Sequence, residues 1–126
     1  MFIALRRNTE WHMRGWENNM EERLRRIYVP MTETGFYILF CLQEEMHGYN
    51  IGKKVSDLTN GEISISPGTM YGTLSKMEKD GLIEFVREEE KRKIYRSTEL
   101  GTEILELEIK RICRLYRNIR GEVYDG

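Results

Sequence analysis

Residues 65–84 read ISPGTMYGTLSKMEKDGLIE and contain the clearest helix pattern of the chain. Ser66 is a good N-cap, and Pro67 at the first helical position loses no hydrogen bond that the helix needs. Gly81 is a natural end signal. We therefore expect a helix over about residues 67–80. Its buried face is predicted by apolar residues at helical spacing, Met70, Leu74 and Met77.

The other side of this helix carries small and hydrogen-bonding residues, among them Thr69, Gly72, Thr73 and Lys76. A helix that enters the major groove of DNA needs donors that reach base edges, and little bulk to hold it away from them. A solvated amphipathic helix shows the same pattern, so the pattern alone leaves both interpretations open.

The elements around this helix complete the winged-helix order, a mainly α fold with a small β-wing. The charged segment REEEKR is expected as the turn between the two wing strands. The expected elements are helices over 32–46 and 49–59, a very short strand over 63–65, the helix over 67–80, strands over 82–86 and 93–97, and a long last helix that Thr98 caps.

The domain organisation follows from these elements. Residues 1–30 are expected as an N-terminal extension that is partly helical or disordered, because only 18–28 show a helical spacing before Val29-Pro30 breaks it. Residues 31–97 are expected as a winged-helix DNA-binding domain. Residues 98–126 are expected as a C-terminal dimerisation helix.

Composition excludes several classes of protein. The 126 residues are 40% hydrophobic and 33% charged, and no apolar run is long enough to cross a bilayer. No nucleophile, phosphate-binding loop or metal cluster shows a recognised spacing, so we expect neither an enzyme nor a cofactor nor a metal. The two cysteines, Cys41 and Cys113, are expected as buried thiols in a reducing cytoplasm. The net charge of −1 neither supports nor excludes DNA binding, because what matters is where the cations lie.

The last helix carries a heptad-like apolar strip, which one small domain cannot cover completely. Self-association is the simple interpretation, and a helix folded entirely onto its own domain is the alternative. A two-fold dimer places its two reading helices about one DNA turn apart, so a palindromic operator is expected. The expected interface residues are Leu105, Ile109, Ile112, Tyr116, Ile119 and Val123.

Three blocks resemble the PadR family of transcriptional regulators: HGYNIGKKV at 47–55, the stretch at 65–84, and RKIYRSTELGTEIL at 92–105. The resemblance covers about residues 32–106. It implies a winged-helix homodimer, usually a repressor that binds an inverted-repeat operator. By this resemblance, seven residues correspond to family positions that support or contact DNA. They are Tyr49, Ser66, Pro67, Gly68, Thr69, Tyr71 and Lys76.

Further DNA contacts are expected beside these. The family often has proline where this chain has Gly72, and its wing tip usually carries glycine and basic residues. Here Glu88, Glu89 and Glu90 would repel phosphates, so wing contacts are expected on the basic residues around them; a solvated hairpin tip is the alternative. The added candidates are Lys53, Lys54, Gly72, Ser75, Arg87, Lys91, Arg92 and Lys93.

Two interpretations stay open. The resemblance implies that some family members sense aromatic compounds. Four aromatic residues of this chain could therefore bind a small aromatic effector, or they could simply be part of the hydrophobic core. These four are Phe36, Tyr37, Phe40 and Tyr116. A winged-helix module that binds another protein, without direct DNA binding, is the alternative function, because the near-neutral charge and acidic wing fit it equally well.

Overall fold

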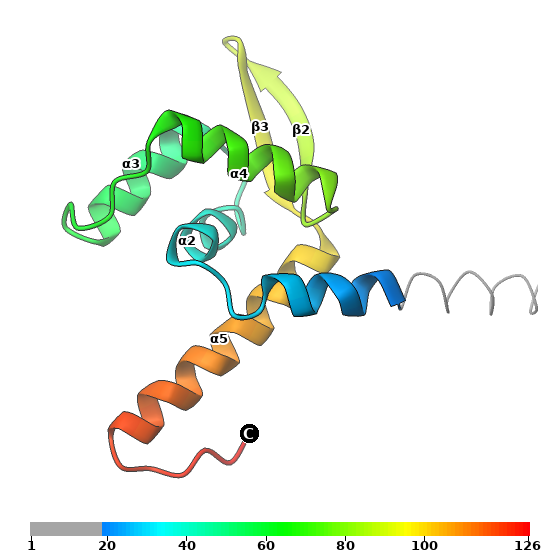
Figure 1. Ribbon diagram of the computed structural model, residues 1–126. Coiled ribbons are helices and arrows are strands. Elements are labelled where there is room, and N and C mark those ends of the chain that lie inside the picture. The colour runs from blue at the N-terminus through cyan, green and yellow to red at the C-terminus, as the bar shows by residue number, and fades with distance from the viewer. Residues whose placement is uncertain (1–18) are drawn as a thin grey trace, which may run out of the picture.

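The computed structural model describes residues 19–126. The part of the N-terminal extension before residue 19 lies outside the described residues. Three helices and a small sheet form the body, and the last helix leaves it (Figure 1). In chain order the elements are a helix over residues 19–28, α2 (Glu33–Cys41), β1 (Met46–His47), α3 (Gly48–Leu58), α4 (Pro67–Lys79), β2 (Ile83–Glu89), β3 (Arg92–Ser97) and α5 (Glu99–Ile119).

The helix expected over 67–80 is confirmed as α4. Ser66 is its N-cap, with the hydroxyl accepting a hydrogen bond from the Thr69 amide, and Pro67 is the first helical residue. Its apolar face lies in the core as predicted. The buried side chains of this face are Met70, Leu74 and Met77.

Two expectations upstream of α4 are wrong. The helix expected over 32–46 ends at Cys41, because Met46 and His47 pair as β1 with the edge of β3. Residues 63–65 form no strand, since β1 occupies that edge. Their backbone is held locally instead, and the amide of Ile63 donates to the hydroxyl of Thr59 at 3.0 Å.

The wing is a longer hairpin than expected. β2 and β3 pair in antiparallel register, with an irregularity between Phe85 and Arg87, and the sheet order is β1-β3-β2. Most of REEEKR is therefore strand. The turn itself falls on Glu90 and Lys91, whose φ angles are 50° and 64°. Two consecutive left-handed residues are what a tight two-residue hairpin turn requires, and here neither is glycine.

One core joins the helices, the wing and the start of α5. Ile38 and Leu39 of α2 lie in the same buried cluster as Ile104 and Leu105 of α5. The start of α5 approaches the chain after α4 so closely that a Cβ on Gly101 would lie 2.0 Å from the carbonyl oxygen of Leu82. The first turns of α5 are therefore part of the winged-helix body.

The rest of α5 projects away from that body (Figure 1). The helix ends at a left-handed Gly121, where the amides of Gly121 and Glu122 donate to the carbonyls of Asn118 and Arg117. This pattern of bonds is the Schellman motif, which stops a helix. Val123 consequently lies outside α5. Cys41 is buried as expected, but Cys113, on the projecting part, is exposed.

The helix over 19–28 packs against the body. Leu24, Tyr28 and Val29 lie against the buried cluster. Arg25 forms a 2.5 Å ion pair with Glu103 of α5. Figure 1 shows this helix running beside the upper part of α5. In residues 19–126 no helix has the length and apolar character that spanning a bilayer requires.

Candidate nucleic-acid interface

The outer face of α4 is open to solvent, as the groove-reading interpretation requires. The hydroxyls of Ser66 and Thr69 hydrogen-bond each other at 3.0 Å at the start of the helix and stay exposed. Neither Gly68 nor Gly72 has an atom within 4 Å of where a Cβ would stand. The exposed residues opposite the core are Gly68, Gly72, Ser75 and Lys79.

A first hollow runs between α3 and the start of α4, and four of the fifteen predicted DNA contacts line it. Two exposed tyrosines, Tyr49 and Tyr71, flank it. Gly48 allows Tyr71 to lie close, because a Cβ there would stand 3.1 Å from the Tyr71 ring. Lys53 and Pro67 also line this hollow. Their proximity comes from the fold, since they are on different helices.

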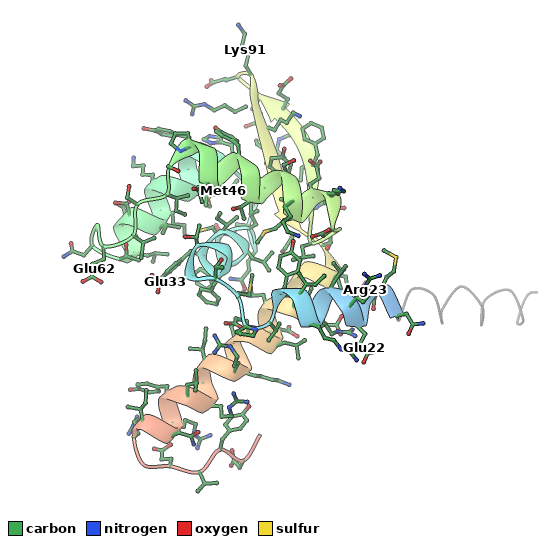
Figure 2. The ribbon with its side chains drawn as sticks, viewed as in Figure 1. Glu22, Arg23, Glu33, Met46, Glu62 and Lys91 are labelled. Atoms are coloured by element: carbon green, nitrogen blue, oxygen red, sulfur yellow. The ribbon has the colours of Figure 1, made fainter. Side chains whose placement is uncertain are left out.

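A second hollow lies between α4 and the wing. The guanidinium of Arg92 stands 4.9 Å from the ring centroid of Tyr49, which joins the wing to α3. Lys91 and Lys93 line the same hollow, together with Glu88. Figure 2 shows Lys91 at the tip of the wing, pointing away from the body. Arg92 and Lys93 thus lie beside this hollow, and Lys91 extends from the wing tip.

Arg87 is placed differently from the other wing cations. Its guanidinium binds the carboxylates of Glu45, in the loop before β1, and Glu89 of its own strand. The hydrogen bonds to Glu45 and Glu89 raise the pKa of Arg87. Glu45 also lies 3.6 Å from Arg96. A phosphate would have to compete with two carboxylates for Arg87, which makes it a weaker candidate than its neighbours.

Lys76 lies on the other side of α4, next to the helix over 19–28. Its ammonium donates to Asp80 at 2.9 Å and stands 5.2 Å from the ring centroid of Tyr28. Lys54 is half-buried at the rear of α3. Burial raises the pKa of the Cys41 thiol, and the charge of Lys54 opposes that rise. Lys54 is therefore less open to a phosphate than Lys53, which is exposed on the same helix.

The apolar strip of α5 divides into a covered and an uncovered part. Leu105 is 1% exposed in the core of its own subunit, and Ile109 packs on the edge of that core. The other four predicted interface residues are exposed. They are Ile112, Tyr116, Ile119 and Val123, at 39%, 58%, 82% and 88%.

The aromatic set proposed for an effector is not gathered within one subunit. Phe36 lies 5.6 Å from Tyr37 and 5.8 Å from Phe40 between ring centroids, at the edge of the core. Tyr116 stands on the projecting part of α5, with the Arg120 guanidinium 5.7 Å from its ring. Among the aromatic pairs of residues 19–126, none joins Tyr116 to the other three.

Comparison with known proteins identifies the class and then the family. The fold is a winged helix in which the outer face of α4 is exposed. The model of the transcriptional regulator PadR-like family matches residues 38–107, and the chain belongs to that family. It is thus a member of a family of transcriptional regulators and not of a family of enzymes. Within residues 19–126, no three histidine, cysteine or acidic side chains are grouped to hold a metal ion.

Individual relatives agree with this family. A transcriptional regulator of Clostridium thermocellum is 26% identical, with a TM-score of 0.60 over 69% of this chain and 88% of its own. Bacillus subtilis PadR, solved in complex with operator DNA, is 24% identical, with a TM-score of 0.54 over 60% of this chain and 45% of its own. The transcriptional regulator YqjI of Escherichia coli is 36% identical over 64 residues, 51% of this chain and 31% of that protein.

Three residues of this surface were missed by sequence reasoning. Glu45 was assigned to a helix, and its pairing with Arg87 depends on the turn that replaces that helix. Asp80 had a signal in the sequence, since it follows Lys76 by one helical turn. Tyr28 had none, because its partner Asp80 is 52 residues away.

Proposed function

We propose that this protein is a sequence-specific DNA-binding repressor that acts as a homodimer on an inverted-repeat operator. The observation that carries the proposal is the open outer face of α4, with small and hydroxyl side chains, next to two adjoining hollows that are lined by Tyr49, Tyr71 and several cations. A helix of this kind can approach the floor of the major groove, because Gly68 and Gly72 leave open space on its outer side.

The expected DNA contacts fall into two groups, those to base edges and those to phosphates. Thr69 and Ser75 on α4 supply short hydrogen-bonding groups for base edges. Lys53 on α3, and Lys91 and Lys93 on the wing, line the hollows beside α4, and we expect them to contact phosphates, which fix the position of a protein on the duplex. The identified relative with a solved operator complex, Bacillus subtilis PadR, has the same fold and supports this use of it.

Salt dependence of DNA binding tests the proposal. A duplex that contains the region upstream of the protein's own gene is titrated at several salt concentrations. The logarithm of the binding constant should fall with that of salt, with a slope of about 0.9 per phosphate contacted. Lys93→Glu should weaken binding, and Lys110→Glu, the same charge change at an exposed position of α5, should not. Equal effects of the two variants would overturn the placement of the interface.

The exposed half of α5 supports a homodimer. Ile112, Tyr116 and Ile119 share one side of a helix that projects from the body, and a second copy of the same helix would cover them. Light scattering at micromolar concentration tests this part. A monomer at that concentration would leave DNA binding possible, but would remove the argument for a palindromic operator.

A protein-binding winged helix is the second candidate function, and the acidic wing favours it. Glu88, Glu89 and Glu90 are all exposed beside the hairpin tip. Failure to bind the upstream duplex, or binding without salt dependence, would favour this candidate. The repressor proposal includes the cytoplasm as the location. It also includes a small aromatic effector, whose site would have to form between Tyr116 of one subunit and Phe36, Tyr37 and Phe40 of the other.

A further inference from the structure

A hydrogen-bonded cluster ties the helix over 19–28 to the end of the reading helix. The hydroxyl of Tyr28 donates to Asp80 Oδ2 at 2.6 Å, and Lys76 Nζ donates to the same oxygen at 2.9 Å. The ammonium also lies over the Tyr28 ring. Residue 28 lies before the part of the chain that the family model matches, which begins at residue 38. The cluster therefore joins a residue outside the matched part of the chain to a predicted DNA contact.

The three members of the cluster differ in freedom. The side chain of Asp80 is 21% exposed, and Asp80 is also the C-cap of α4. The side chain of Lys76 is 60% exposed, on a long flexible stem. The carboxylate is thus a fixed charge, held from the other side by Tyr28. The ammonium is the part that can move toward a new partner.

Asp80 is held in its charged form. Burial works to raise the pKa of Asp80, but the hydrogen bonds from Tyr28 and Lys76 outweigh it and lower the pKa. Burial and the hydrogen bond to Asp80 raise the pKa of Tyr28, so the phenol stays a donor. Asp80 therefore keeps its negative charge at the end of α4.

The cluster borders the outer face of α4. Lys76, Gly72 and Tyr28 line one hollow of about 450 Å³ between the two helices. Gly72 has open space beyond it. A duplex that lies against Gly72 therefore comes within reach of the Lys76 ammonium, and also near the charge of Asp80.

We propose that Tyr28 and Asp80 are positioning residues that set how strongly Lys76 binds DNA phosphates. This inference rests on the proposed DNA-binding function. Asp80 occupies one N–H of the ammonium and repels an approaching phosphate, so Lys76 exchanges a carboxylate for a phosphate when DNA binds. Tyr28 shares the carboxylate and so weakens its hold on Lys76. The effect is independent of sequence, because phosphates are the partners.

Asp80→Asn in the full chain tests this exchange. The amide oxygen still accepts from Tyr28, but the charge that holds Lys76 is gone. Affinity should rise about threefold, equally for the operator and for a scrambled duplex, since removing one nearby exposed charge is worth under about 1 kcal/mol. The salt slope should stay the same, because Lys76 contacts a phosphate in both proteins. A purely structural role of Asp80 would lower affinity instead.

Two further variants complete the test. Asp80→Asn should have no effect in a Lys76→Ala background, because the cation on which Asp80 acts is missing. Tyr28→Phe should lower affinity about twofold, opposite in sign to Asp80→Asn, because the carboxylate then binds Lys76 alone. Thermal unfolding of each variant verifies that the fold is kept.

The outcomes separate this inference from the proposed function. If the wild-type chain binds the operator but Asp80→Asn leaves the affinity unchanged, the positioning role is wrong and DNA binding stands. An equal gain in the Lys76→Ala background also overturns it. If the wild-type chain binds neither duplex, the proposed function itself fails.

Discussion

The guanidinium of Arg92 on β3 stands over the ring of Tyr49 on α3, 4.9 Å from its centroid. This contact joins the β2–β3 hairpin to α3 at the edge of the proposed DNA-binding surface. An exposed cation–π contact is worth about 0.5–1 kcal/mol. The contact holds Arg92, which stands between Lys91 and Lys93 in the sequence, against α3.

Arg92→Lys should loosen the wing, although it keeps the charge. Lysine lacks the flat guanidinium that stacks on Tyr49. Amide hydrogen exchange near the hairpin tip should become about threefold faster, which corresponds to the loss of one such contact. Arg96→Lys is the control, since Arg96 binds Glu84 on β2 and not the Tyr49 ring. An equal response to both variants would show that the stacking does not hold the wing.

Gly101→Ala should destabilise the fold. Its Cβ would stand 2.0 Å from the Leu82 carbonyl oxygen, so α5 must move away from the body at a cost of about 3 kcal/mol. Gly72→Ala is the matched control, because the Cβ meets no atom within 4 Å in the middle of α4. It should stabilise the protein by about 0.5–1 kcal/mol. Chemical denaturation measures both, and a milder effect at Gly101 than at Gly72 would contradict the observed packing.

Ile119→Asp should convert the proposed dimer to a monomer. Ile119 is 82% exposed in one subunit, so a charge there costs nothing in the monomer, but would be buried between two α5 helices. Thr102→Asp introduces the same charge at an exposed position of α5 on the body and should leave the dimer intact. Light scattering compares the masses. A dimer that survives Ile119→Asp would place the interface elsewhere.

Tyr28 should ionise above the ordinary pKa of a tyrosine in an alkaline titration. Burial, followed by the hydrogen bond to Asp80 and its charge, raises the pKa of Tyr28 above the unfolded value of about 10. The raised pKa means that the phenol's contribution to stability is complete below about pH 10 and is lost as pH rises through the folded value. The phenolate absorbance of the Tyr28→Phe variant should lack one step that lies above pH 10 in the wild-type titration. Removal of an early step instead would show that the Tyr28 hydroxyl is not held by Asp80.

Local patterns predicted the elements that have their own start and stop signals. α4 was found to within one residue, because Ser66 and Pro67 begin it and Gly81 follows its end. Thr98 likewise begins α5 as expected. The family resemblance was confirmed as well, since the matched blocks lie in residues 38–107.

Long-range pairing explains the errors. Nothing near Met46 and His47 shows that β3 has a free edge for them, so they were assigned to a helix. The irregularity between Phe85 and Arg87 and the two-residue turn at Glu90 likewise depend on both strands together. Leu105 and Ile112 belong to one apolar strip in the sequence, but the core covers only the first.

The sequence by itself determined a winged helix with a reading helix that begins at Ser66, because caps and apolar spacing act over a few residues. Only the tertiary structure decided which cations are free. Arg87 and Lys76 resemble Lys93 in sequence, yet Glu45 holds the first, and Asp80 with Tyr28 holds the second. The physical reason is that a charge is modified by what folding brings within a few ångströms, and these partners come from distant parts of the chain.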